Sequence, residues 1–230
     1  MRCKEMGYRT KNERVIMNAP DSQYFYPPQA YAERLPSTKC RVIATSWSTN
    51  PRKGFATYSW LEKNLDWERF ELTFVGDTSV SFTRANLVGP CDSEKLGRHL
   101  RSHDIILTAS RADPCSNALL EGMACGLPAV AYRDGGHPEI IGDGGELFST
   151  HDELLRKLEL VRRDLDKYRE RLPDRDCRKV ASDYLSFFRD CADISTQPIG
   201  PFSVTQLRAR ALMRKLRGRF STIFGKRKLV

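Results

Sequence analysis

The sequence predicts an α/β domain with a doubly wound, Rossmann-like parallel sheet, followed by a basic helical tail. Short apolar runs alternate with segments of helical pattern between residues 41 and 132, as in strand–helix–strand units. Polar residues gather just after these runs, at the strand ends where open α/β sheets bind ligands. The final stretch, residues 204–230, combines apolar residues at helical spacing with many arginines and lysines.

The first predicted strand covers residues 41–45 and leads through the loop 46–54 into a helix that ends near Leu65. Such a loop suits an anion, because free backbone N–H groups and the positive helix end face the ligand. Arg52 and Lys53 precede this helix, where the helix dipole slightly disfavours positive charge. Two solvated side chains are the alternative interpretation, and this mild conflict is one observation in favour of a functional role for Lys53.

Two further strands are expected over residues 71–76 and 86–90, and then a helix over 93–102 with Ser93 as its N-cap. His99 and His103 are one helical turn apart, which is a possible metal-binding spacing. No acidic or cysteine partner accompanies them, so the pattern favours a solvated helix end. We expect no metal site in this chain.

The segment from Ile105 to Phe148 organises the domain. It predicts a strand over 105–109, a helix over 117–125 that Gly126 and Pro128 terminate, and a second strand over 129–132. The polar residues at the two strand ends are Ser110, Asp113, Ser116 and Asn117 after the first, and Gly135, Gly136 and Glu139 after the second.

This segment resembles the signature of the family 4 (group 1) glycosyltransferases, which reads S-x-x-E-P-F-G-x-x-x-x-E-A-M-A-x-G-x-P-V-V-A and then G-G-x-P-E. The matching residues are Ser110, Pro114, Glu121, Met123, Ala124, Gly126, Pro128, Val130, Ala131, Gly135, Gly136, Pro138 and Glu139. The departures include Asp113 at the first acidic position and Pro114-Cys115-Ser116 in place of P-F-G.

Residues 15–27 resemble the family's V-I-x-N-G-V-D-x-x-x-F linker between its two domains. That interpretation implies that the chain begins where the carboxy-terminal, donor-binding half of a GT-B enzyme begins. An ordinary surface segment is the alternative. The loop 46–54 resembles the family's G-R-x-x-x-x-K-G, with Ser48 at the arginine position, Lys53-Gly54 at K-G, and Arg52 as a substitute cation.

The resemblance implies transfer of a sugar from a nucleoside diphosphate sugar to an acceptor, usually with retained configuration and without a metal or other cofactor. It assigns Asp113 to the donor sugar, Glu121 to the ribose hydroxyls and Lys53 to the diphosphate. The remaining residues expected to bind the donor are Arg52, Gly54, Ser116, Asn117, Gly135 and Gly136. The alternatives are a capping or salt-bridged Glu121 and a turn-forming Asp113; Glu139 is expected to brace its loop.

Helices over residues 151–169 and 175–191 are expected to close the domain. Asp174-Arg175-Asp176 imitates the D-x-D of metal-dependent glycosyltransferases, but its place at a helix start favours capping. The expected organisation is a polar segment over 1–14, the nucleotide-sugar-binding domain over 15–193, a linker over 194–203 and the basic amphipathic tail over 204–230.

The net charge of +9 comes from the tail alone, since the 29 other basic residues balance 29 acidic ones. A neutral body argues against nucleic-acid binding. The tail suits an anionic membrane surface, or packs on a missing partner domain, or is disordered. Seven scattered cysteines and the absence of a membrane-spanning apolar run indicate a cytoplasmic protein, peripheral on a membrane if the tail binds one.

Two classes of function stay open. One is a hexosyltransferase-like enzyme, as in polysaccharide biosynthesis, that needs an N-terminal acceptor domain or subunit. The other is a non-catalytic nucleotide-sugar-binding subunit or fragment that associates with a membrane through its tail. The sequence specifies neither the base, the sugar, the glycan, lipid or protein acceptor, nor the oligomeric state.

Overall fold

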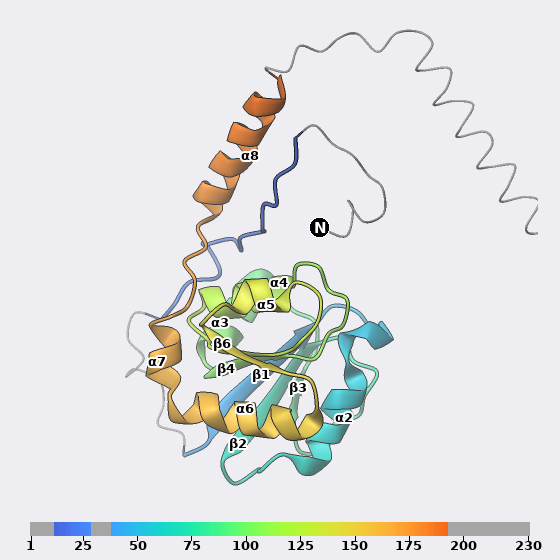
Figure 1. The fold of residues 1–230 in the computed structure, drawn as a ribbon. Coiled ribbons are helices and arrows are strands. Elements are labelled where there is room, and N and C mark those ends of the chain that lie inside the picture. The colour runs from blue at the N-terminus through green and yellow to red at the C-terminus, as the bar shows by residue number, and fades with distance from the viewer. Residues whose placement is uncertain (1–11, 29–37, 193–230) are drawn as a thin grey trace, which may run out of the picture. The chain divides into compact units, whose positions relative to one another are not determined.

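The computed structural model describes residues 12–28 and 38–192 (Figure 1). The chain forms two compact units. Residues 15–184 make up one of them, and the other combines Met1–Arg14 with Leu185–Val230. The expected linker 194–203 and the basic tail 204–230 lie outside the described residues. The sheet and all the predicted site residues belong to the unit 15–184.

Six parallel strands form one sheet in the order β3-β2-β1-β4-β5-β6. Their bounds are β1 Cys40–Ser46, β2 Phe70–Gly76, β3 Asn86–Val88, β4 Ile105–Thr108, β5 Ala129–Tyr132 and β6 Gly145–Phe148. This is the doubly wound Rossmann order, so the predicted fold class is confirmed, and β6 is a strand that the sequence analysis missed. The strand order reverses between β1 and β4, where Val42 pairs with Ile105. Such a switch point is the usual ligand site of this fold.

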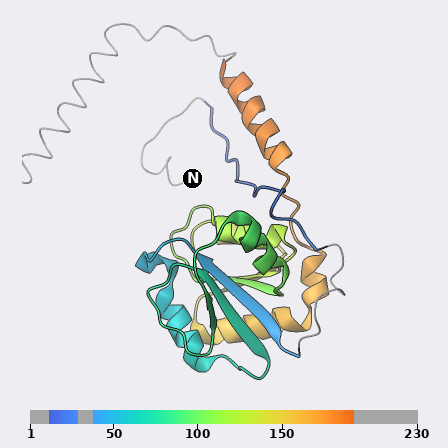
Figure 2. The ribbon, with the colours of Figure 1, turned by 180° about the vertical axis from the view of Figure 1, so that it is seen from behind.

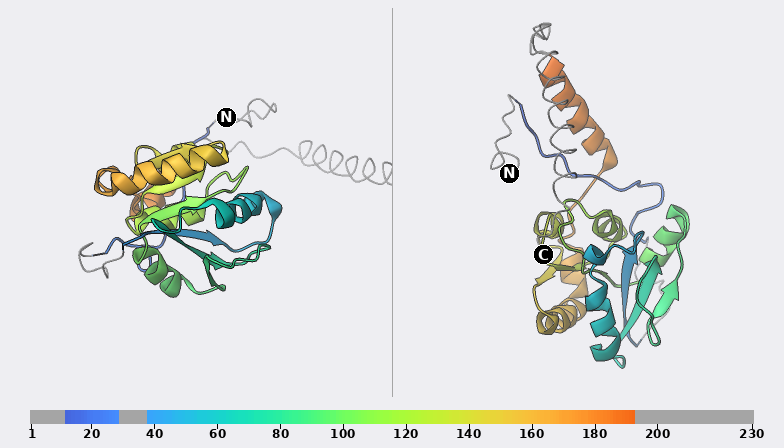
Figure 3. Two further views of the ribbon diagram at one scale, coloured as in Figure 1. Left: turned by 90° about the horizontal axis from the view of Figure 1, so that it is seen from below. Right: turned by 90° about the vertical axis from the view of Figure 1, so that its right-hand side faces the viewer.

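The described helices lie between these strands or, for α6, α7 and α8, after the last of them. They are the short 3-10 helix Pro51–Lys53, α2 Phe55–Asn64, α3 Ser93–Arg101, α4 Asn117–Ala124, α5 His137–Ile141, α6 His151–Arg163, α7 Leu165–Arg169 and α8 Cys177–Ala192. Helices α2 and α6 pack on one face of the sheet, and α3, α4 and α5 on the other. Figures 1 and 2 show the sheet from opposite sides, and Figure 3 shows it between α6 and α3.

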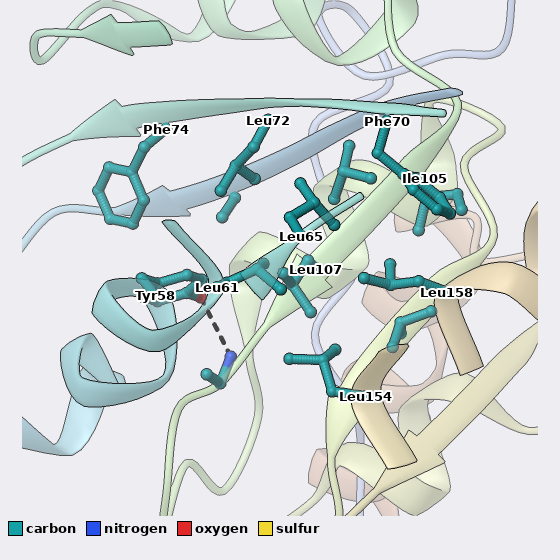
Figure 4. Close-up of a cluster of buried hydrophobic side chains, with 14 of the residues drawn as sticks. Tyr58, Leu61, Leu65, Phe70, Leu72, Phe74, Ile105, Leu107, Leu154 and Leu158 are labelled. Carbon is teal, nitrogen blue, oxygen red and sulfur yellow. Dashed lines mark hydrogen bonds between the residues drawn. The ribbon is translucent and has the colours of Figure 1, made fainter. Parts of the chain in front are cut away.

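The core under α2 and α6 is aromatic and aliphatic (Figure 4). Tyr58 packs edge-on against Phe74 of β2 with ring centroids 5.2 Å apart. Leu154 and Leu158 of α6 are fully buried beside them. Burial of a large apolar side chain stabilises a fold by about 1.5–3 kcal/mol. The hydroxyl of Tyr58 accepts a hydrogen bond from the Ala109 N–H at 3.1 Å, which ties the end of β4 to α2.

The segment 15–28 packs on the opposite layer. Phe25 is buried in the cluster under α3 and α4, and Arg101 of α3 donates to the Tyr24 carbonyl at 2.8 Å. A Cβ on Gly97 would lie 2.3 Å from that same carbonyl oxygen, so glycine is what lets the segment approach α3. This segment is therefore part of the domain rather than a loose extension.

Three details of the predicted helices are wrong. Asp92, not Ser93, is the N-cap of α3, since its carboxylate accepts from the Lys95 N–H. The expected single helix 151–169 is interrupted at Asp164, giving α6 and α7. His103 is buried rather than solvated, with its ring Nδ1 2.6 Å from the His99 carbonyl, and burial lowers its pKa to about 4.

The capping role predicted for the D-R-D stretch is confirmed, because the carboxylate of Asp176 accepts from the Arg178 N–H at 2.8 Å. Among the described residues, no three potential metal-ligating side chains gather together. Within the same ranges, every helix is too short or too polar to cross a membrane.

Candidate functional site

The loops that follow β1 and β4 meet at the switch point. Gly54 has φ +80°, and a Cβ there would lie 2.1 Å from the Ala109 carbonyl oxygen. The N–H of Arg111 donates to the Arg52 carbonyl at 2.7 Å. Backbone contact therefore fixes the position of the Arg52-Lys53-Gly54 turn against the loop that leads to Asp113.

These two loops bring together Lys53 and Asp113. The Lys53 Nζ lies 3.4 Å from Asp113 Oδ2, and the side chains are 37% and 15% exposed. A cation and a carboxylate thus stand side by side at the carboxyl ends of the two central strands. From the family resemblance, Lys53 was expected at the donor's diphosphate and Asp113 at its sugar, and the structure places the two side chains in contact.

The loop after β5 closes on the same place. A Cβ on Gly135 would lie 2.2 Å from the Asp113 carbonyl oxygen, and one on Gly136 would lie 2.2 Å from that of Pro114. The Gly136 N–H also donates to the Asp113 carbonyl at 2.9 Å. The glycine pair was expected to let the backbone approach a ligand. In the structure it lets the backbone approach the Asp113 loop.

Beside this contact stands Asp134, which the sequence analysis missed. Its carboxylate accepts from the Ala112 N–H at 2.9 Å and from the Gly135 N–H at 2.7 Å. These bonds lower the pKa of Asp134. Ala112 has φ +52°, a left-handed conformation that costs a non-glycine residue roughly 1–2 kcal/mol. The sequence around Asp134 gives no sign of this role, because the strained residue that Asp134 contacts, Ala112, lies in another loop.

Ser110 faces the interior of the domain. Its hydroxyl lies 3.2 Å from the Nε2 of fully buried His137 and 3.1 Å from the Thr108 hydroxyl. The His137 Nδ1 lies 2.7 Å from the Tyr132 carbonyl, so Nδ1–H donates there, and Nε2 is left to pair with the Ser110 hydroxyl. Ser110 and His137 therefore lock the loops after β4 and β5 together.

Glu121 lies on α4 and lines a cleft of about 380 Å³ between that helix and residues 18–25. Burial raises the pKa of Glu121 to about 7. Within the described part of the chain it has no hydrogen-bond or ion-pair partner, and α4 has no side-chain cap bond at its N-terminus. The alternative of a capping or salt-bridged glutamate thus finds no support there.

The start of α4 borders both the Asp113 loop and the cleft that Glu121 lines. Ser116 is its buried N-cap, but its side chain makes no capping bond, so the first N–H groups of the helix lack a side-chain acceptor. Asn117 Oδ1 accepts from the Asn18 side chain at 3.2 Å and lines the same cleft as Glu121. The helix end thus offers N–H donors shortly after Asp113 in the chain.

The remaining predicted residues lie at the edge of this arrangement. The Arg52 side chain is exposed. Ser48 uses its hydroxyl to accept from the Asn50 N–H at 3.1 Å, so it shapes its own loop. The exposed Glu139 contributes its backbone carbonyl, not its carboxylate, to a long 3.4 Å contact with Arg175.

This fold is that of the Rossmann-like domains of GT-B glycosyltransferases. The sucrose-phosphate synthase from Thermosynechococcus elongatus superposes with a TM-score of 0.65 at 17% identity, over 84% of this chain and 56% of that one. A glycosyltransferase involved in avilamycin A biosynthesis gives 0.56 at 17%, over 81% and 60%. The catalytic domain of starch synthase IV from Arabidopsis thaliana, bound to ADP and acarbose, gives 0.56 at 14%, over 67% and 39%.

Residues 61–164 match the family model of the glycosyl transferases group 1. A probable sucrose-phosphate synthase of Thermosipho melanesiensis is 35% identical over 82 residues, which is 35% of this chain and 18% of that protein. N-acetyl-alpha-D-glucosaminyl L-malate synthase of Bacillus anthracis is 33% identical over 103 residues, 40% of this chain and 27% of that protein. The matches thus cover about a fifth to a quarter of these relatives.

Proposed function

We propose that this chain is the donor-binding part of a retaining, hexosyltransferase-like glycosyltransferase that uses a nucleoside diphosphate sugar. The observation that carries the proposal is the 3.4 Å pair of Lys53 and Asp113 at the switch point. The donor needs a cation at its diphosphate and a carboxylate near its sugar, and this pair supplies both from two adjacent loops.

The chemistry of transfer fits these groups. The bond between the anomeric carbon and the phosphate oxygen breaks, and a bond to the acceptor oxygen forms. Positive charge builds on the sugar and negative charge on the departing diphosphate. Lys53, the nearby Arg52 and the N–H groups at the start of α4 would stabilise the leaving group. With these donors the diphosphate requires no metal, and Asp113 would orient the sugar.

The nucleoside would occupy the cleft that Glu121 lines. Its volume of about 380 Å³ falls within the usual size of small-molecule sites. A carboxylate without a protein partner is suited to accept the ribose hydroxyls. The structural neighbour that binds ADP, starch synthase IV, supports a nucleoside diphosphate as the class of ligand.

Calorimetric titration of the full chain with ADP, UDP, GDP and their glucose conjugates tests the proposal. We expect one nucleotide to bind, and Lys53→Ala and Glu121→Ala each to weaken it. Lys63→Ala, an exposed lysine at the end of α2, and Glu68→Ala, an exposed glutamate, are the matched controls. If the parent chain bound no nucleotide, the proposal would fail.

A binding subunit without turnover is the second candidate. The replacement of the family's glutamate and arginine by Asp113 and Ser48 favours it. A partner supplying an acceptor domain would then complete an enzyme. Release of nucleoside diphosphate in the presence of any sugar or lipid acceptor would exclude this candidate.

Cytoplasmic location and membrane contact through residues 204–230 also belong to the proposal. The charge of this tail supports the membrane contact, since about 1 kcal/mol of attraction accompanies each basic residue near an anionic surface. Sedimentation with phosphatidylserine vesicles should be lost when residues 204–230 are deleted. Equal sedimentation of the full and shortened chains would contradict the role of the tail.

A further inference from the structure

Asp134 joins two loops that lie far apart in the sequence. One carboxylate oxygen accepts from the N–H of the next residue, Gly135, at 2.7 Å. The other accepts from the Ala112 N–H at 2.9 Å, 22 residues away. A turn that only needed its own stabilisation would make the first bond. The second bond fixes the residue that directly precedes Asp113.

This second bond is important because Ala112 has an unfavourable backbone conformation. Its φ of +52° is left-handed, a region that alanine leaves unless other contacts hold it. The peptide between Ala112 and Asp113 takes its direction from that angle. Any return of Ala112 to an ordinary conformation would therefore turn Asp113 away from Lys53.

Asp113 is held from its other side as well. The Gly136 N–H donates to the Asp113 carbonyl at 2.9 Å, and the contacts of Gly135 and Gly136 leave no room for a Cβ. The Asp134-Gly135-Gly136 turn thus forms two hydrogen bonds with the Asp113 loop, one at the N–H of Ala112 and one at the carbonyl of Asp113.

We infer that Asp134 is a positioning residue, which holds Ala112 in its left-handed conformation and thereby sets the Asp113 carboxylate against the donor sugar. This inference rests on the proposed function for the identity of the ligand. It predicts an effect on the sugar rather than on the nucleotide, because Ala112 does not line the cleft of Glu121, and the backbone of the Lys53 turn is held by Ala109 and Arg111 rather than by Ala112.

The test uses the full chain and four variants: Asp134→Ala, Asp134→Asn, Asp134→Ala combined with Ala112→Gly, and Asp143→Ala. Asparagine keeps one acceptor oxygen and so can satisfy only one of the two N–H groups. Glycine adopts the left-handed conformation freely, so Ala112→Gly should compensate for the lost carboxylate. Asp143 is an exposed carboxylate just beyond α5 and is the matched control.

Amide hydrogen exchange followed by NMR is the first measurement, because it needs no ligand. In Asp134→Ala we expect the Ala112 and Gly136 amides to exchange at least about tenfold faster, while the core amides of β1 stay protected. The glycine double variant should restore the protection of Gly136. Unchanged exchange at Gly136 would overturn the inference, since Asp113 would then not depend on Asp134.

Binding is the second measurement, with the nucleoside diphosphate that the parent binds and its tightest hexose conjugate. Asp134→Ala should weaken the conjugate about tenfold or more and the nucleotide less than about twofold, with Asp134→Asn between. An equal loss for both ligands, or no loss, would contradict the positioning role. If the parent chain bound no nucleotide, the proposed function would be refuted. The exchange measurement would still decide whether Asp134 holds the Asp113 loop in place.

Discussion

The Lys53 amino group lies 3.4 Å from the Asp113 carboxylate, and each residue stands in the loop after one of the two central strands. Nothing local joins them. The contact exists because β1 and β4 are neighbours in the sheet and because Gly54 lets their loops touch. An ion pair at that place is easily exchanged for contacts with a ligand.

We expect the pair to matter for binding and little for stability. Because Lys53 is 37% exposed, the pair should contribute less than about 1 kcal/mol to the free energy of unfolding. Lys53→Ala should weaken nucleotide binding by about 10- to 100-fold, or about 1.4–2.8 kcal/mol. Urea denaturation and calorimetry of Lys53→Ala, Asp113→Asn and the double variant measure both. A stability loss of several kcal/mol would instead mark a structural pair.

Replacement of Glu121 should change how stability depends on pH. The folded state raises the pKa of Glu121 from 4.5 to about 7, so it binds a proton that the unfolded chain has released between these values. Stability should therefore fall as the pH rises from about 4.5 to about 7. Glu121→Gln should be more stable than the parent at pH 8, by up to about 3 kcal/mol, and equal at pH 4. An equal difference in stability between Glu121→Gln and the parent at pH 4 and at pH 8 would contradict this.

Nucleotide binding should release a proton from Glu121. Ribose hydroxyls that donate to the carboxylate favour its charged form, so binding near pH 7 should lower the raised pKa. Calorimetry in buffers of different ionisation enthalpy measures the protons released. Glu121→Gln is the control, because the nucleotide phosphate titrates equally in both chains. The same proton release in both would show that the ligand does not touch Glu121.

Gly54→Ala should destabilise the domain strongly. The new Cβ would lie 2.1 Å from the Ala109 carbonyl oxygen, and the residue has φ +80°, so both sterics and backbone strain oppose it. We expect a loss of about 3 kcal/mol or more in the free energy of unfolding. Gly89→Ala, where no atom lies within 4 Å, should change it by less than about 0.5 kcal/mol. Similar melting temperatures for the two variants would be evidence against this packing.

Glu62 should hold the loop that follows β2. Its buried carboxylate accepts from the Thr83 N–H and hydroxyl and from the N–H groups of Arg84 and Ala85, at 2.6–3.2 Å. Glu62→Ala leaves these donors unpaired and should cost about 2–4 kcal/mol. Hydrogen exchange should localise the change to residues 78–85. The exposed Glu68→Ala serves as the control, and an undisturbed loop in Glu62→Ala would show that the carboxylate is dispensable.

The elements that the sequence predicted best are those whose signal lies entirely within their own residues. Residues 105–108, 117–124 and 129–132 each form the expected element, because a short apolar run or a stopped helix is a local signal. β6 escaped notice because only Leu147 and Phe148 of its four residues are apolar. α5 was missed because Gly135, Gly136 and Pro138 pointed to a turn.

For the site, residue types were predictable but their partners were not. Lys53, Asp113 and Glu121 stood out by position and by resemblance. The buried His137 contacts Ser110, 27 residues away, and Asp134 contacts Ala112. Both links depend on how two loops turn after neighbouring strands, and no spacing within either loop records that geometry.

The place of β1 in the sheet has a consequence for folding order. Val42 pairs with Leu72 of β2 on one side and with Ile105 of β4 on the other. During synthesis β1, β2 and β3 can assemble before β4, β5 and β6 have left the ribosome. The loops of Lys53 and Asp113 come from different halves, so they meet only when the two halves join. A ligand that contacts both loops could therefore bind only after the two halves have joined. Protection of the chain from proteolysis by that ligand would report that folding is complete.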